Sequence, residues 1–200
     1  MLRGSLVWVA LPLVLTGCSA ARARSASDLP ADATDSTADD VAASVQPANF
    51  AQVRDGLYRG GHPSNAQLDY LKSIGVDTIV DLEIGDFIEA TPWSISDEES
   101  AAKAKGFTFI RKPMSAFEPF VSDKEMSDTM TLLDDSSNGT VYVHCKHGQD
   151  RTGLVIGLER VLDEGWEPAD AYQEMLDRGF HPEFIGLKHY FDEKTGYDDD

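Results

Sequence analysis

Apolar residues in the middle and at the end of the chain follow two alternating spacings. Short runs rich in β-branched and aromatic residues occupy positions 77–82, 107–110 and 140–143, and a shorter run begins at Val53. Runs of this length, bounded by glycine and polar residues, predict buried β-strands. Between them, apolar residues return at every third or fourth position, which predicts helices with one buried face.

Capping residues and glycines divide these intervals into separate helices. Three pairs with the spacing of a capping box predict helix starts, namely Ser64 with Gln67, Ser96 with Glu99, and Ser122 with Glu125. Glycines predict where helices end, at Gly75, Gly106, Gly165 and Gly179. Prolines predict the starts of the last two helices, at Pro168 and Pro182.

This alternation of strands and helices predicts an α/β fold with a central, mostly parallel sheet flanked by helices. In such sheets the ligand binds at the carboxyl ends of the strands. No internal repeat is present, so we expect one folded domain over residues 49–196, which is long enough for a proper core. A short acidic tail follows at 197–200.

The first 18 residues have the proportions of a targeting segment. Arg3 precedes an apolar run at positions 6–15, which is too short to span a bilayer and matches the hydrophobic part of a signal peptide. Leu15-Thr16-Gly17-Cys18 resembles the bacterial lipobox. This resemblance implies that residues 1–17 are a signal peptide, that cleavage occurs before Cys18, and that Cys18 is acylated. An ordinary secretory signal is the alternative.

The lipobox resemblance also implies a location. Residues 18–48 are mostly Ala, Ser, Asp and Thr and cannot bury enough apolar surface to order themselves, so we expect a lipidated, flexible tether. Ser19, by the same resemblance, permits sorting to the outer membrane. We therefore expect a lipid-anchored protein of the bacterial cell envelope that faces the periplasm, in the outer membrane, with the inner membrane left open.

Charge and cysteine content limit the partners. The formal net charge is −18 over 200 residues, which argues against nucleic acid, because a binder of the phosphate backbone needs a basic face. The chain has two cysteines, and once Cys18 carries lipid, Cys145 has no partner for an intramolecular disulfide. We expect a monomer that meets the membrane through the lipid on Cys18.

Most of the candidate catalytic residues lie in one segment between the last predicted strand and the next helix, His144-Cys145-Lys146-His147-Gly148-Gln149-Asp150-Arg151-Thr152-Gly153. A turn from strand into helix presents backbone N–H groups that can cradle a phosphate. The helix start and nearby cations favour the thiolate form of Cys145. The guanidinium of Arg151 matches two phosphate oxygens, and the hydroxyl of Thr152 is placed to donate to the sulfur. These residues predict a thiolate nucleophile inside an oxyanion-binding loop.

The sequence His-Cys-x5-Arg-Thr-Gly resembles the signature of the protein tyrosine and dual-specificity phosphatase superfamily. Segments 57–63 and 178–182 resemble those of small bacterial and fungal atypical dual-specificity phosphatases, so the resemblance covers about residues 49–192. It implies a dual-specificity-phosphatase-like fold with a strand, a phosphate loop and a helix at the active site. A rhodanese-type sulfurtransferase also uses a cysteine loop at a helix start, but Arg-Thr-Gly is not expected there.

The general acid departs from this family pattern. Members usually carry an aspartate on the loop after the preceding strand, whereas residues 114–121 contain none. Asp123 follows in the first turn of a predicted helix, where acidic residues commonly lie for dipole reasons. Glu118 and Asp150 are therefore the candidates. We favour Asp150, because the loop is similar to that of myotubularin-type phosphoinositide phosphatases, in which this aspartate is implicated as the acid.

The rim of the loop bears on the substrate. We assign Lys146, His147, Gly148 and Gln149 to substrate binding, because basic loop residues hold additional phosphates in inositol phosphatases; solvent-facing residues without a ligand are the alternative. Further basic residues near the rim are Arg59, His62, Arg111, Lys112 and His181. We expect His144 to orient its neighbours rather than to act as an acid. We expect no cluster of metal ligands and no cofactor.

Together these features predict a metal-independent phosphomonoester hydrolase with Cys145, Arg151, Asp150 and Thr152 as catalytic residues. Cys145 attacks phosphorus to form a phosphocysteine, while Arg151 and the loop amides stabilise the equatorial oxygens. The favoured substrates are inositol polyphosphates or phosphoinositide headgroups, and phosphotyrosine proteins or peptides are the alternative. A catalytically silent, phosphate-binding lipoprotein is a more distant alternative.

Overall fold

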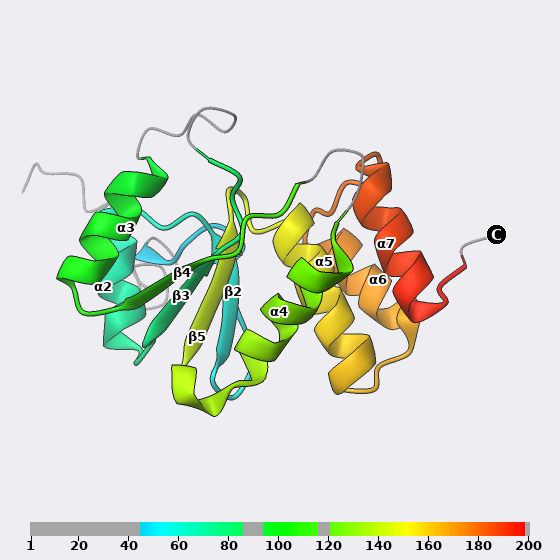
Figure 1. Ribbon diagram of the computed structural model, residues 1–200, viewed down its shortest axis with the longest axis horizontal. Coiled ribbons are helices and arrows are strands. Elements are labelled where there is room, and N and C mark those ends of the chain that lie inside the picture. The colour runs from blue at the N-terminus through cyan, green and yellow to red at the C-terminus, as the bar shows by residue number, and fades with distance from the viewer. Residues whose placement is uncertain (1–44, 86–93, 116–120, 199–200) are drawn as a thin grey trace, which may run out of the picture. The chain divides into compact units, whose positions relative to one another are not determined.

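The computed structural model of the chain describes residues 45–85, 94–115 and 121–198. These residues form a five-stranded sheet in the order β1-β2-β5-β3-β4 (Figure 1). The strands are β1 (Ala51–Arg54), β2 (Leu57–Gly61), β3 (Thr78–Asp81), β4 (Thr108–Arg111) and β5 (Val141–Cys145). β1 pairs antiparallel with β2 at one edge and the other neighbours are parallel, which confirms the mostly parallel sheet.

The first strand pair differs from the sequence prediction. The run that begins at Val53 predicts one short strand there, whereas the chain forms a hairpin of β1 and β2. Asp55 and Gly56 close the hairpin, and Gly56 has a φ of +75°, which glycine adopts without steric cost. Because the turn is only two residues long, the two strands resemble a single run in the sequence.

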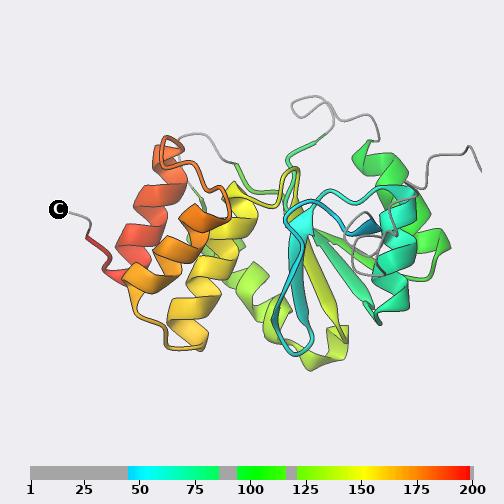
Figure 2. The same ribbon diagram turned by 180° about the vertical axis from the view of Figure 1, so that it is seen from behind.

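Helices cover both faces of the sheet (Figures 1 and 2). On one face lie α2 (Asn65–Ser73) and α3 (Ile95–Ala104). On the other face lie α4 (Asp123–Asp134), α5 (Asp150–Leu158), α6 (Pro168–Asp177) and α7 (Ile185–Thr195). A 3-10 turn, η1 (Ser136–Asn138), precedes β5, and a π-helical turn, η2 (Glu159–Asp163), extends α5. This layering confirms the predicted α/β class.

Two of the three predicted capping serines are confirmed. The hydroxyls of Ser64 and Ser122 cap α2 and α4, each accepting a hydrogen bond from the backbone N–H three residues later. The start predicted at Ser96 is wrong, because the capping box of α3 is formed by Ser94 and Asp97. The earlier start places one more apolar residue on the buried face of α3.

The last two helices confirm one proline signal and correct the other. Pro168 is the first residue of α6, where its missing N–H has no cost. α7, in contrast, begins at Ile185 rather than at Pro182. A separate turn comes first, in which the N–H of Phe184 donates to the carbonyl of His181.

Side chains of β5 alternate between the two layers. Val141, Val143 and Cys145 belong to the hydrophobic core on the side of α4 to α7, whereas Tyr142 belongs to the core under α2 and α3. Successive residues of a strand point to opposite faces of the sheet. His144 therefore lies on the face of Tyr142, and the two rings stack with centroids 5.6 Å apart. The cysteine and the histidine before it thus face different layers.

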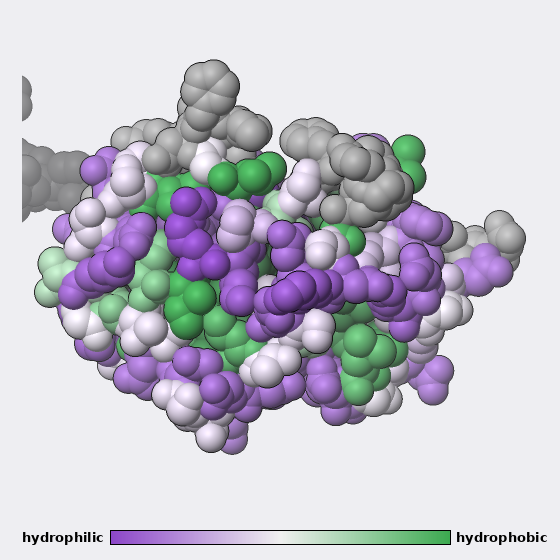
Figure 3. Space-filling view, viewed as in Figure 1, coloured by the Kyte–Doolittle hydropathy of each residue, from purple (hydrophilic) through white to green (hydrophobic). Residues whose placement is uncertain are grey.

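Residues 1–44 lie outside the described part of the chain, and with them the predicted signal peptide, Cys18 and most of the tether. Residues just before the predicted boundary at 49 contact the domain, since the carbonyl of Ala48 accepts a hydrogen bond from the N–H of Gly61. Among the described helices, none is long and apolar enough to cross a membrane. The face drawn in Figure 3 is largely hydrophilic, as the strongly negative net charge leads one to expect.

Gly157 in α5 tests how tightly the helices pack on this side of the sheet. A Cβ at Gly157 would overlap the sulfur of Met175 and lie 3.1 Å from the ring of Phe191. We expect Gly157→Ala to lower the free energy of unfolding by about 1–3 kcal/mol, despite the better helix propensity of alanine. The matched control is Gly153→Ala in the same helix, where the nearest atom, on Phe180, is 3.6 Å away. Urea denaturation compares the two variants, and equal losses would contradict this account.

Candidate active site

The phosphate loop joins the end of β5 to the start of α5. Cys145 is the last residue of β5 and Asp150 is the first of α5, so residues 146–149 form the turn itself. Gly148 has a φ of +71°, and a Cβ there would collide with the backbone of Gly60 at the end of β2. Only glycine allows the loop to lie this close to the neighbouring strand.

Cys145 lies at the carboxyl edge of the sheet. Its side chain is buried, and it is the only cysteine in the described part of the chain. The parallel pairing places it beside Gly61, the last residue of β2. The carboxyl ends of β3 and β4 meet at the same edge. The cysteine therefore occupies the position at which parallel sheets bind their ligands, as predicted.

Arg151 and Thr152 follow in the first turn of α5. The Arg151 side chain is largely buried, and its Nη1 donates to the carbonyl of Leu82 at 3.3 Å, which ties the start of α5 to the end of β3. The hydroxyl of Thr152 is buried and has no hydrogen-bond partner among the described residues. The predicted hydrogen bond from Thr152 to the sulfur of Cys145 is therefore not formed in this structure.

Arg59 supports the loop instead of lining its rim. Its side chain is 1% exposed, and Nη2 donates to the carbonyl of Gly148 at 2.9 Å. Burial is the main cause that lowers the pKa of Arg59 to about 10, and the positive charge of Arg178 adds to it. The amide of Asn49 donates to the same carbonyl at 3.3 Å. The structure therefore gives no support to a contact between Arg59 and the substrate, because β2 directs its side chain into the interior. No sequence pattern pointed to Asn49.

The predicted rim residues Lys146, His147 and Gln149 lie together at the surface of the loop. His147 is exposed, and Lys146 and Gln149 are half-buried. Beside the loop is an open cavity of about 440 Å³, and His147, Gln149 and Arg178 contribute to its lining. The structure therefore places two of the predicted rim residues, together with Arg178, at one hollow next to the nucleophile loop.

Three other basic residues predicted near the rim have acidic partners. The pairs are Arg111 with Asp81 at 3.2 Å, Lys112 with Asp128 at 4.0 Å, and His62 with Glu83 at 2.6 Å. Each of these contacts gives the basic group a carboxylate partner within the protein. The assignment of these three residues to substrate binding therefore gains no support from the structure.

Asp150 is held by His181. Its Oδ1 accepts hydrogen bonds from the backbone N–H and from Nδ1 of His181, both at 2.9 Å. The hydrogen bond and the charge of Asp150 raise the pKa of His181 above its ordinary value. Asp150 thus lies at the loop with one oxygen engaged. The other candidate acid, Glu118, lies outside the described residues. Asp123 sits in the first turn of α4, as predicted.

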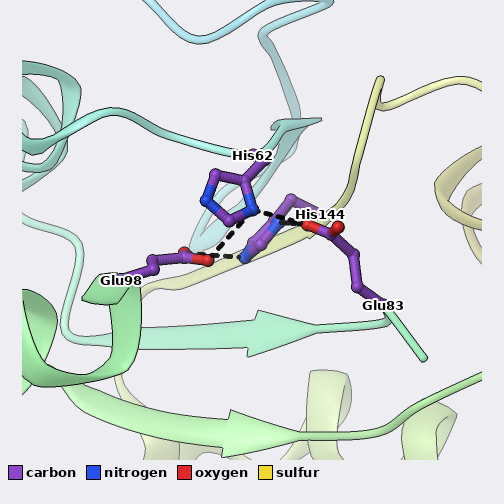
Figure 4. Close-up of side chains that lie close together, drawn as sticks. All are labelled: His62, Glu83, Glu98 and His144. Atoms are coloured by element: carbon purple, nitrogen blue, oxygen red, sulfur yellow. Dashed lines mark hydrogen bonds and ion pairs between the residues drawn. The ribbon is translucent and has the colours of Figure 1, made fainter. Parts of the chain in front are cut away.

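No cluster of potential metal ligands is predicted from the sequence, but the fold brings one together. His62, Glu83, Glu98 and His144 converge behind the phosphate loop, on the layer of α2 and α3 (Figure 4). Each offers a nitrogen or oxygen atom, and these four atoms all lie within 4.8 Å of one another. We call these four side chains the buried His-Glu cluster. It was missed because its members come from four separate segments.

Burial and charge oppose each other in the buried His-Glu cluster. Burial disfavours the imidazolium form of His144, but the negative charges of Glu98, Asp81 and Glu83 outweigh it and raise the pKa of His144 to about 10. The pKa of Glu83 responds to the same balance: burial raises it, whereas the hydrogen bond from His62 and the charge of His144 bring it below its usual value. Without a bound metal ion, His144 is therefore protonated and positively charged. A histidine that holds its proton this firmly fits an orienting role better than that of an acid.

Comparison with known proteins gives consistent matches. The model of a family described as the tyrosine phosphatase family matches residues 44–181. Inositol diphosphatase DSP4 of Arabidopsis thaliana is 30% identical over 159 residues, which cover 72% of this chain and 77% of that protein. Dual specificity protein phosphatase TpbA of Pseudomonas aeruginosa is 28% identical over 145 residues, which cover 71% of this chain and 60% of that protein.

The solved structures show the same fold. The core catalytic domain of the PP-IP phosphatase SIW14 from S. cerevisiae superimposes with a TM-score of 0.63 at 21% identity, covering 78% of this chain and 88% of that one. The family match spans the whole sheet and the phosphate loop, with Cys145 at the strand end and Arg151 in the first helical turn. The chain therefore belongs to the tyrosine phosphatase family and is a cysteine-dependent phosphatase of the atypical dual-specificity superfamily.

Proposed function

We propose that the chain removes phosphate from inositol polyphosphates or from phosphoinositide headgroups. The observation that carries this proposal is the pair Lys146 and His147, which directly follows the nucleophile and lies at the rim of the loop. In a chain with a formal net charge of −18, two basic side chains at this place favour a substrate with several phosphates. The name of the Arabidopsis relative, an inositol diphosphatase, supports the same class of substrate.

The proposed reaction proceeds in two steps. The thiolate of Cys145 attacks phosphorus, the bond between phosphorus and the leaving oxygen breaks, and the acid gives that oxygen a proton. Water then attacks the phosphocysteine, which releases inorganic phosphate and restores the thiolate. Arg151 and the loop amides stabilise the charge on the three equatorial oxygens in both steps. The nucleophile is a side chain, so no metal ion takes part in the reaction as written.

A second candidate function is the hydrolysis of phosphotyrosine or phosphoserine and phosphothreonine in proteins. The similarity to the Pseudomonas dual specificity protein phosphatase favours it. The two candidates differ in the number of phosphates on the substrate. A ring with several phosphates can contact the nucleophile loop and the rim together, whereas a single phosphotyrosine engages the loop alone.

The rim residues provide the test between these substrates. We expect Lys146→Ala combined with His147→Ala to raise KM for a polyphosphorylated inositol and to change it little for a phosphotyrosine peptide. Each charge-assisted contact contributes up to about 1.5–3 kcal/mol, which corresponds to roughly a ten- to hundred-fold rise in KM. Steady-state phosphate release on both substrates measures the effect, and Cys145→Ser gives the inactive baseline.

A matched control removes the same two charges elsewhere. Lys124 and His189 are exposed and lie on α4 and α7, away from the phosphate loop. Lys124→Ala with His189→Ala should leave KM for both substrates unchanged. Equal losses on the inositol and the peptide in the loop variant would refute the role of Lys146 and His147 in substrate choice.

We propose that Asp150 is the general acid. An alkoxide leaving an inositol ring is strongly basic and needs a proton as the bond breaks, whereas an activated aryl oxide departs without one. We therefore expect Asp150→Asn to reduce kcat about 10²–10⁴-fold on the inositol phosphate and much less on an aryl phosphate. Asp123→Asn, in the first turn of α4, is the matched control. Equal losses on both substrates would assign Asp150 to loop structure, and a selective loss in Glu118→Gln would assign the role to Glu118.

We propose that lipid on Cys18 anchors the protein in the outer membrane, with the phosphatase domain in the periplasm. The tetrapeptide Leu15-Thr16-Gly17-Cys18 supports this proposal. Cys18→Ser should move the protein from the membrane fraction to the soluble fraction, because the lipid on Cys18 is the membrane contact that we expect for this chain. Cys145→Ser, which keeps the lipidation site, should remain in the membrane fraction. Retention of the Cys18 variant would refute the anchor, and density separation of the membranes would distinguish outer from inner.

A further inference from the structure

The buried His-Glu cluster unites four segments of the chain at the carboxyl edge of the sheet. His62 follows β2, Glu83 follows β3, Glu98 lies in the first turn of α3, and His144 is the penultimate residue of β5. Glu83, Glu98 and His144 are fully buried, and the side chain of His62 is 8% exposed. In Figure 4 the four side chains point toward one another from the separate elements. Such convergence of ionisable groups away from water requires a compensating partner.

Acceptors outnumber aligned donors within the cluster. Nδ1 of His62 lies 2.6 Å from Glu83 Oε1 and 3.4 Å from Glu98 Oε2, although one ring nitrogen carries at most one hydrogen. Nε2 of His144 lies 3.0 Å from Glu98 Oε1, but the alignment does not make a hydrogen bond. Neither oxygen of Glu98 nor Oε2 of Glu83 has a hydrogen-bond partner in the described part of the chain. A cation bound through one atom of each side chain would compensate the charge of the two buried carboxylates.

The spacing of these atoms matches that of ligands around one ion. Zinc binds imidazole nitrogen and carboxylate oxygen at about 2.0–2.2 Å, which puts neighbouring ligands of a tetrahedral site about 3.3–3.6 Å apart. With one atom taken from each residue, the four candidate ligand atoms all lie within 4.8 Å of one another. Among the printed contacts, Nδ1 of His62 lies 2.6 Å from Glu83 Oε1 and 3.4 Å from Glu98 Oε2, so one of these two distances falls within this range and the other is shorter. We propose that His62, Glu83, Glu98 and His144 bind one divalent transition-metal ion, with Zn²⁺ as the best fit.

The ligand set indicates which ion is bound and what it does. Two imidazoles favour zinc and its first-row neighbours over Mg²⁺ and Ca²⁺, which prefer oxygen ligands. Two carboxylates neutralise the double charge of the ion. Four protein ligands leave no open position, which is typical of structural zinc sites rather than of catalytic ones. The ion therefore cross-links the ends of β2, β3 and β5 to α3 and fixes His144, the residue before the nucleophile.

The competing account is a buried ion-pair network without a metal, in which a proton on His144 takes the place of the ion. Elemental analysis and thermal unfolding distinguish the two. Both thiols are removed first, as Cys18→Ser with Cys145→Ser, because a thiolate is the other strong zinc ligand in this chain. We expect about one equivalent of bound Zn²⁺ per chain. After dialysis against a chelator, Zn²⁺ in 100-fold excess over its Kd should raise Tm by about 5–10 °C, and Mg²⁺ should not.

Variants within the cluster locate the ion. His62→Gln and Glu98→Gln, made separately, should each lose most of the bound zinc and the zinc-dependent rise in Tm. The matched controls, His189→Gln on α7 and Glu99→Gln beside Glu98 on α3, should keep both. Co²⁺ in place of zinc should give the absorption of a nitrogen and oxygen site, without a thiolate charge-transfer band. Absence of stoichiometric zinc with no change in Tm, or full zinc retention in both cluster variants, would overturn the proposal. The zinc titration of the chain that lacks only the two thiols decides the question even if the cluster variants do not fold.

Discussion

The shape of the phosphate loop depends on direct contact between the backbones of Gly148 and Gly60. The parallel pairing of β2 with β5 aligns Gly60 with His144 and Gly61 with Cys145, so the loop after β5 has to pass close to the end of β2. A side chain at Gly148 would push the two segments apart. Arg59 holds the carbonyl of Gly148 from the interior. A loop that binds an anion through its N–H groups needs its carbonyl oxygens turned away from the anion. Arg59 on β2 does this for Gly148 by donating a hydrogen bond to its carbonyl.

The two faces of β5 separate the reacting group from the buried charges. Cys145 faces the layer of α5, and His144 faces the layer of α3, because neighbouring residues of a strand point in opposite directions. The end of β3 connects the two sides. The N–H of Leu82 donates to the carbonyl of His144, and the carbonyl of Leu82 accepts from Arg151. Leu82, directly after β3, thus connects the backbone of His144 to the side chain of Arg151 in the phosphate loop.

Local patterns predicted most of the fold and the centre of the site. The strands and the loop from Cys145 to Arg151 follow from runs and spacings that act within a few residues. The errors arose where two local signals competed, as for Ser94 and Ser96, either of which can cap a helix. Arg59 shows a different limit. Its place in a strand can be predicted from the sequence. Whether its side chain lies at the rim of the phosphate loop or beneath the loop depends on which segment packs above it.

The sequence by itself determined the alternation of strands and helices, the nucleophile loop and the membership of the superfamily, because each is written in contiguous residues. Only the tertiary structure decided that Asp150 meets His181, or that His62 and Glu98 meet His144. These contacts join residues between 31 and 82 positions apart, and no backbone period relates them. They exist because the order of the strands brings several strand ends to one edge, and because helices on both faces exclude water from that edge.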